Sequence, residues 1–434
     1  MREKRKMKDI LHKERKVLLD KFWGSSMSLI SMGANFLCHL VNVLVGHRLP
    51  ARPRILAALG LNILLFLAST LLTRLDTDPW QLQFYCLTLA FALLFNINDS
   101  IFQGWSDLRS LQLVLPMLSG AYTAVMARFP PAYMGAMMQG QVSSHWRRTG
   151  NKFSLLIGGQ GFGGILSSGL SVVLLAAGQG DSVGAATWYF LFAAVFLLAT
   201  LLIYAALTRH ALYQLHAGPA KEEEEVERSP GSALGHLAVV RRVWRPALCV
   251  FLVCLLNLSL YPALLRLAEP VHEAAAWATY FLPVGVFLAF NLLDFLGRLL
   301  ASWLHWPPAS EAGTTLCLAA SVARFALVPL FLVCNLSPED RHVTPVLIKS
   351  DTGSGRWGRA WSLASSILAC VSVFLLLHAL LSLSGGFLLT AAMMAAPQLV
   401  EAEHQAVVGA VMVLTLVAGL LAGAVLSFGW LLIL

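Results

Sequence analysis

Charged residues are scarce in this sequence of 434 residues. Asp, Glu, Lys and Arg together make up 12% of it, whereas hydrophobic residues make up 57%. A soluble globular domain carries about twice that share of charge. The composition therefore argues against a soluble enzyme or binding domain and predicts an all-α polytopic membrane protein.

Cysteine gives no sign of a metal site or a disulfide framework. The seven cysteines lie almost entirely in apolar runs and never at metal-ligand spacing. We interpret them as small core residues and expect no metal and no cofactor. The pattern of a cleavable signal peptide is also missing, because the basic start leads into a full-length apolar run.

Apolar runs of about 20 residues, the length that crosses a bilayer, recur along the whole chain. Nine are clear, and two more are expected in a less regular stretch, so we predict ten or eleven transmembrane helices. The clear runs are Ser26–Gly46, Ile55–Leu75, Leu82–Phe102, Ala186–Leu207, Pro246–Leu265, Tyr280–Trp303, Thr315–Cys334, Leu363–Ala396 and Ala406–Leu434, and the other two are Leu111–Met126 and Leu155–Gly178.

The net charge of +8 is concentrated in two polar segments. We interpret the basic tail at residues 1–23 as a cytoplasmic segment that touches anionic lipid, rather than as a nucleic-acid-binding segment. The second segment, 209–245, has the composition of a solvated cytoplasmic linker. It separates an N-terminal membrane half, 24–208, from a C-terminal membrane half, 246–434.

Three polar side chains, Asn291, Asp294 and Arg298, interrupt the apolar run Tyr280–Trp303. Insertion scales assign a cost of roughly 2.5 to 3.5 kcal/mol to a charge at the centre of a membrane helix, so such residues usually line a cavity, pair or handle a solute. Asp294 and Arg298 are four residues apart and can form an ion pair, and Phe287 lies on the same helix face. This stripe predicts the polar wall of a transport pathway.

The sequence around the stripe resembles the eighth-helix signature of the equilibrative nucleoside transporters, and further motifs in the same order extend the resemblance over most of the chain. The signature comprises Tyr280–Pro283, Phe290–Arg298 and Trp306-Pro307. The other motifs are Arg48–Pro50, Pro131–Tyr133, Gly140-Gln141 and Gly161–Gly164 upstream, and Arg324–Asn335, Ser384–Phe387 and Gly423–Phe428 downstream.

This resemblance implies a major-facilitator-like bundle, with six helices before and five after a cytoplasmic loop and a solute site between the halves. It implies that a nucleoside, purine or pyrimidine, is bound by two groups of side chains. Asn291, Asp294 and Arg298 would face the nucleoside, with Asp294 and Arg298 reaching its ribose hydroxyls or forming the ion pair that shapes the site, while Phe287, Met32 and Gln103 would contact its base. The resemblance further implies structural or gating roles for Gly140, Gly161, Gly164, Pro262 and Arg324.

Other interpretations of these residues remain open. Met32 and Phe287 are also typical packing residues, and the pair of Asp294 and Arg298 could be purely structural. Asp99 and Asp294 could in principle form an aspartyl protease dyad, but such a dyad shares a proton. Arg298 favours the ionised form of Asp294 and opposes this, so we expect no enzyme.

The sequence also departs from the family pattern. Ser26–Gly46 matches the family's second helix, so we expect its first helix to be absent from this sequence. Three segments are additional relative to the family spacing: Gly104–Ser119, Val142–Gln160 and Thr352–Cys370. The second separates Gly140-Gln141 from Gly161–Gly164, unless residues 158–160 replace Gly140-Gln141 in a rebuilt helix.

We therefore expect facilitative nucleoside transport by alternating access. The alternatives are a truncated or mis-spliced family member without transport activity and a proton-responsive lysosomal transporter. We expect a multi-pass protein in the plasma membrane, with the lysosomal membrane as the alternative, and no nucleic-acid partner. The sequence leaves the oligomeric state open.

Overall fold

A computed structural model describes most of the predicted membrane segments, and every structural statement below concerns these residues. They are 26–41, 51–75, 81–102, 152–178, 181–207, 233–262, 264–265, 280–304, 307–332, 358–401 and 404–433. All secondary structure in these ranges is helical. Gln103, Gly140 and the predicted span Leu111–Met126 lie outside them.

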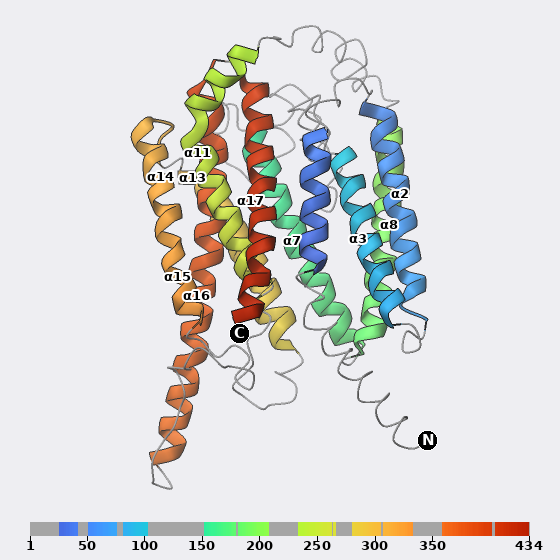
Figure 1. Cartoon of the computed structure of the whole chain (residues 1–434). Coiled ribbons are helices and arrows are strands. Elements are labelled where there is room, and N and C mark those ends of the chain that lie inside the picture. Colours follow the sequence, from blue (N-terminus) through green and yellow to red (C-terminus); the bar gives the residue numbers. More distant parts are fainter. Residues whose placement is uncertain are drawn as a thin grey trace, which may run out of the picture.

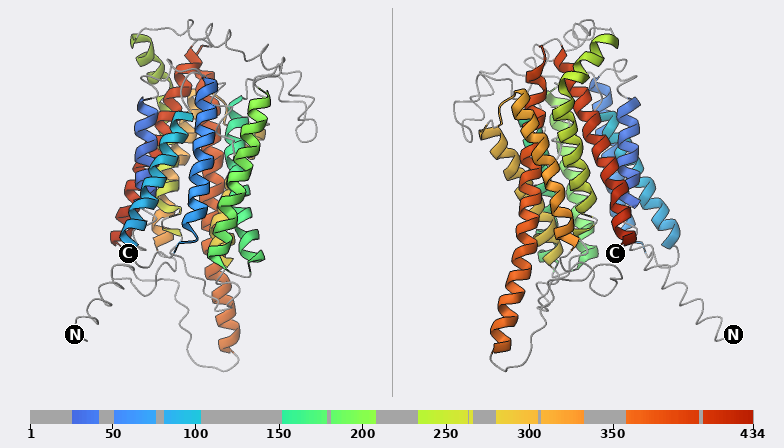
Figure 2. Two further views of the ribbon diagram at one scale, coloured as in Figure 1. Left: turned by 90° about the vertical axis from the view of Figure 1, so that its right-hand side faces the viewer. Right: turned by 60° about the vertical axis from the view of Figure 1, so that its left-hand side comes forward.

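The described helices form two groups, shown in Figure 1 and from two further sides in Figure 2. The first group contains the Ser26–Val41 helix, α2 (Ala51–Leu72), α3 (Gln81–Phe102), α7 (Lys152–Ala177) and α8 (Ser182–Leu207). The second contains α11 (Ala233–Leu260), η5 (Phe281–Leu288), α13 (Ala289–Leu304), α14 (Glu311–Ala323), η6 (Arg324–Ala326), α15 (Leu327–Leu332), α16 (Gly358–Ala395), η7 (Ala396–Leu399) and α17 (Gln405–Ile433).

Length and composition identify this chain as a multi-pass membrane protein. Six of the described helical segments are long and apolar enough to cross a membrane, and four shorter apolar helices accompany them. The six are Val183–Ala206, Val239–Leu260, Phe281–Leu304, Glu311–Leu332, Phe374–Leu399 and Val407–Trp430. The prediction of an all-α polytopic fold is therefore confirmed.

Helix α7 connects the two groups, because it packs on α8 in the first group and on η5, α13 and α16 in the second. Within the second group α11 lies along α17 and also contacts α14 and α16, while α13 lies along α16. Gly419 and Gly423 of α17 make the close approach to α11 possible, because a Cβ atom at Gly419 would lie 2.5 Å from the Phe251 carbonyl oxygen.

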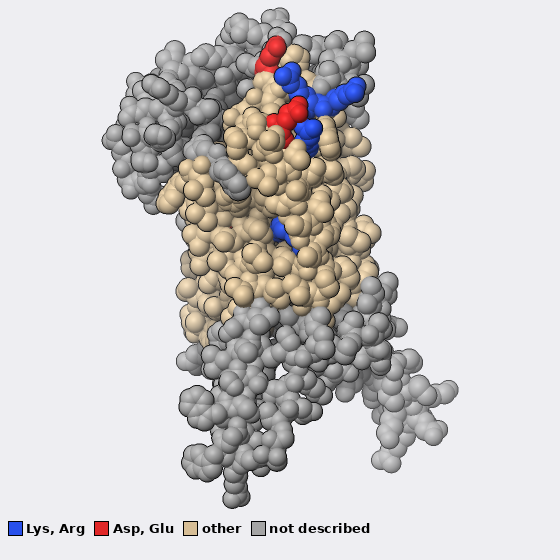
Figure 3. All heavy atoms as spheres, turned by 90° about the vertical axis from the view of Figure 1, so that its left-hand side faces the viewer, with Lys and Arg blue, Asp and Glu red and all other residues tan. Residues whose placement is uncertain are grey.

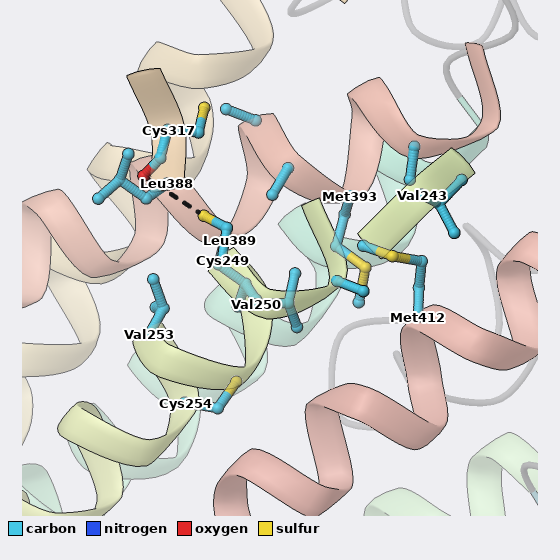
Figure 4. Packing of buried hydrophobic residues seen from close by; sticks show 14 of the residues in the cluster. Val243, Cys249, Val250, Val253, Cys254, Cys317, Leu388, Leu389, Met393 and Met412 are labelled. Carbon is cyan, nitrogen blue, oxygen red and sulfur yellow. Dashed lines mark hydrogen bonds between the residues drawn. The ribbon is translucent and has the colours of Figure 1, made fainter. Parts of the chain in front are cut away.

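The largest buried apolar cluster lies where α11, α16 and α17 meet (Figure 4). The prediction that cysteines are core residues is confirmed for Cys249, Cys254 and Cys317, whose side chains are buried. The Cys249 thiol lies 3.6 Å from the Cys317 carbonyl oxygen. The prediction is wrong for Cys86, which is exposed on α3.

Three helix boundaries differ from the apolar runs in the sequence. Helix α11 begins at Ala233, so the last part of the predicted linker is helical. Helix α16 has 38 residues, and its first part extends beyond the bundle in Figure 1. Helix α7 is continuous through residues 158–164, as expected if the fifth-helix glycine motif is rebuilt from Gly158–Gln160.

The Ser26–Val41 helix begins at the end of the bundle opposite to the start of α11 (Figures 1 and 2). The cytoplasmic locations of the tail at 1–23 and of the linker at 209–245 stay predictions.

Candidate functional site

The polar stripe occupies one side of η5 and α13, and leucines occupy the other. At about 100° per residue, Phe287, Asn291, Asp294 and Arg298 fall within a sector of about 60°. Leu292, Leu296 and Leu300, on the opposite side, are 44%, 41% and 38% exposed. The stripe therefore faces the protein interior while the leucines face outward, as expected for a membrane helix with lipid on one side.

Asp294 and Arg298 form the ion pair that their spacing predicts. The Arg298 Nε atom donates a hydrogen bond of 2.6 Å to Asp294 Oδ2. Their side chains retain only 9% and 12% of their exposure, so little water competes for the charges. Charge-assisted hydrogen bonds of this kind are among the strongest in proteins.

Glycines bring the backbone of α16 directly onto the Asp294 turn. A Cβ atom at Gly386 would overlap the carbonyl oxygen of Asp294. One turn further along α13, a Cβ atom at Gly297 would overlap the carbonyl oxygen of Leu383. Larger residues at either glycine would separate the helices, so the Ser384–Phe387 motif fixes the depth at which Asp294 is buried.

Asn291 lies where the two halves of the protein meet. A Cβ atom at Gly164 of α7 would overlap Asn291 Oδ1 and would lie 2.9 Å from its Cγ atom. The Asn291 Nδ2 atom donates to the Phe287 carbonyl oxygen at 3.0 Å. Because Gly164 has no side chain, α7 of the N-terminal half contacts Asn291 of the C-terminal half directly.

Aromatic rings cover the stripe on the side of α11. The Tyr261 ring stacks on Phe290 with 3.8 Å between centroids and meets Phe287 edge-on at 5.9 Å. Its phenol group also lies within hydrogen-bonding reach of the Asn291 side chain. Tyr261 follows the last residue of α11, and a cis peptide bond joins it to Pro262. Together these rings connect the end of α11 to the stripe.

A second buried polar cluster is centred on Arg324, at the junction of α14 and η6. The Arg324 guanidinium donates to Ser384 Oγ at 2.9 Å, to Asn257 Oδ1 at 2.7 Å and to the Leu381 carbonyl oxygen at 2.7 Å. Its Nη1 atom has no hydrogen-bond partner among the described residues. Arg324 therefore joins three helices, α11, α14 and α16, which agrees with a structural role.

Sequence reasoning missed Asn257, Tyr261 and His378 as members of this region. His378 of α16 is fully buried, and its ring lies 5.7 Å from Phe290 between centroids. Each of the three is a polar side chain within or beside an apolar run, and this position is the feature of the sequence that could have indicated a place in the site. Nothing in the sequence alone indicates which run each one faces.

The remaining predicted residues are less tightly connected to the stripe. Met32 is half-buried on the Ser26–Val41 helix, whose Gly33 lies beside Leu421 of α17. Gly161 lies in α7, one turn before Gly164. Within the described chain, no three His, Cys, Asp or Glu side chains gather in a way that could hold a metal ion.

A known protein family and individual relatives match most of this chain. A family model described as "Nucleoside transporter" matches residues 132–354 and 359–432. The chain belongs to this family. Equilibrative nucleoside transporter 3 of Rattus norvegicus is 26% identical over 93% of this chain and 77% of its own length. Equilibrative nucleoside transporters 1 and 2 of Homo sapiens are 25% and 26% identical, over 94% and 93% of this chain and 82% and 83% of their own lengths. The resemblance found in the motifs is thereby confirmed.

Proposed function

We propose that this protein transports nucleosides across a membrane by facilitated diffusion, with alternating access to one central site. Family membership supports the substrate class. The observation that carries the proposal is the stripe of buried Asp294 and part-buried Asn291 and Arg298 at the meeting of α7, α13 and α16. Binding sites at the junction of two membrane halves are typical of alternating-access transporters.

The chemistry of the stripe fits a ribose. Vicinal hydroxyl groups can donate to the Asp294 carboxylate and accept from the Arg298 guanidinium, so one ribose would bond to both members of the ion pair. Phe287 would pack against the base, and Asn291 would bond to its polar edge. We extend the base contact to Met32 and Gln103, as the family resemblance implies.

The contact between Gly164 and Asn291 supports a role for the stripe in alternating access. Helix α7 comes from the N-terminal half and α13 from the C-terminal half, so rocking of the halves changes this contact. A nucleoside bound at Asn291 would thus meet both halves. No coupling ion is required, and transport follows the nucleoside gradient.

No covalent chemistry is part of this proposal. The Asp294 carboxylate accepts a hydrogen bond from Arg298 in an ion pair, and we assign it to solute binding rather than to catalysis. We place the protein in the plasma membrane, and surface biotinylation of expressing cells tests that location.

Uptake of labelled adenosine and uridine by transporter-deficient cells tests the function. We expect uptake by the natural chain and its loss in Asp294→Asn and Arg298→Gln, at equal surface abundance. Leu296→Ala is the matched control, because Leu296 lies on the outward face of α13 and its loss should leave uptake unchanged. Full uptake by both polar variants would remove the site assignment. Absence of uptake by the natural chain would instead favour a family member without transport activity.

A further inference from the structure

Basic side chains gather where α11 enters its membrane span. Arg241, Arg242 and Arg245 lie within the first turns of the apolar segment Val239–Leu260, and the first two are exposed. Figure 3 shows Lys and Arg atoms gathered with a few acidic ones at one end of the described surface, above a broad band that is nearly free of charge. With a bilayer around the uncharged band, Arg241, Arg242 and Arg245 at the start of the apolar segment would lie where hydrocarbon changes to headgroups.

Four side chains of α11 form an outward stripe, distinct from the polar stripe of α13, that changes from charged to aromatic to aliphatic along the helix. Arg241, Trp244, Arg245 and Leu248 follow the spacing i, i+3, i+4, i+7 and therefore share one face. Trp244 is 47% and Leu248 38% exposed, and the Arg245 guanidinium carbon lies 5.4 Å from the Trp244 ring centroid. The order of guanidinium, indole and leucine matches the order of headgroup, interface and hydrocarbon in a membrane.

Acidic side chains balance only part of this charge. Arg245 pairs with Glu311 of α14 at 3.3 Å. Glu401, which follows η7 at the same end, forms no pair with these arginines. Neither Arg241 nor Arg242 has an acidic partner among the described residues. Like charges at i and i+4 repel, so Arg241 beside Arg245 favours an external anion.

We propose that this stripe, together with the neighbouring exposed Arg242, binds an anionic phospholipid, with the headgroup phosphate on Arg241 and Arg242 and an acyl chain along Leu248. A free anion would use the arginines alone, whereas a phospholipid also covers the exposed Trp244 and Leu248. The ligand would lie against α11 beside Glu311 of α14. Inside the bundle the same two helices are joined by the hydrogen bond from Arg324 to Asn257.

The lipid would therefore cover the outer end of α11, beside the ion pair of Arg245 with Glu311 that joins this end to α14. The arginines lie four turns or more before Tyr261 along α11, far from the proposed nucleoside contacts. Loss of the lipid should consequently lower the rate of transport and the thermal stability, and leave the KM for nucleoside unchanged.

The test uses the purified full-length protein, with phosphatidylserine or phosphatidylcholine added to the detergent, and measures lipid binding and the unfolding temperature. We expect phosphatidylserine to bind and to raise the unfolding temperature. In Arg241→Gln/Arg242→Gln its affinity should fall about fivefold for each arginine removed. In proteoliposomes, phosphatidylserine should raise the maximal uptake rate of the natural chain and not that of the double variant.

Two variants serve as matched controls. Glu311→Gln removes an acidic group from the same patch, so it should keep or strengthen the response to phosphatidylserine. Arg74→Gln removes an exposed arginine after α2, at the opposite end of the bundle, and should leave the response unchanged. An equal response of the double variant and the natural chain would overturn the proposal. The same stabilisation by inorganic phosphate would also overturn it, because the ligand would then be a free anion.

Discussion

Gly164→Ala tests whether the contact between α7 and Asn291 controls transport. The added methyl group would overlap the Asn291 amide oxygen and lie 2.9 Å from its Cγ atom, so Asn291 or α7 must move. Overpacking of this kind typically costs about 1–3 kcal/mol. If the cost falls only on the conformation in which α7 packs on Asn291, the ratio of conformations shifts by about 5- to 150-fold.

The assay is uridine uptake at equal surface abundance, together with the unfolding temperature of the purified protein. We expect Gly164→Ala to lower uptake severalfold and to reduce the unfolding temperature. Gly169→Ala is the matched control in the same helix, because a Cβ atom there meets nothing within 4 Å. Asn291→Ala should restore the stability of the Gly164→Ala variant and not its transport, because Asn291 is itself a proposed substrate contact. Equal behaviour of the two glycine variants would refute this reasoning.

Two further predictions concern the buried charges. Asp294→Leu leaves Arg298 buried without its carboxylate and should destabilise the protein by about 3–5 kcal/mol, measured by denaturant unfolding. Asp294→Leu/Arg298→Met should recover most of that stability while uptake stays absent. A double variant as unstable as the single one would contradict the ion-pair explanation. Arg324→Leu should lower the unfolding temperature more than Arg324→Lys, because lysine can still bond to Asn257 or Ser384, and hydrogen bonds to charged groups contribute about 1.5–3 kcal/mol each. Equal losses in the two variants would contradict the expectation that lysine keeps part of these bonds.

The sequence predicted those features that depend on one helix. Runs of about 20 apolar residues located the spans, and a spacing of four predicted the pair of Asp294 and Arg298, because both follow from helix geometry alone. Contacts between helices were not accessible in this way. Asn257 and Arg324 are 67 residues apart, and no periodicity indicates that they meet. Boundaries were missed for a related reason: α11 starts in a polar segment whose residues are compatible with either a helix or a linker.

The double glycine of α16 explains why two polar clusters can lie so close together inside a membrane protein. A Cβ atom at Gly385 would lie 2.8 Å from Asn257 Nδ2 and 2.9 Å from Arg324 Nη2, whereas one at Gly386 would overlap the Asp294 backbone. Gly385 and Gly386 thus face different polar clusters, and only the backbone of α16 separates the two clusters. Away from the helix ends, the described C-terminal half contains one carboxylate, Asp294, and two guanidiniums. This excess of positive charge disfavours cationic solutes, and hydroxyl and carbonyl oxygens of the proposed nucleoside could accept hydrogen bonds from the guanidiniums.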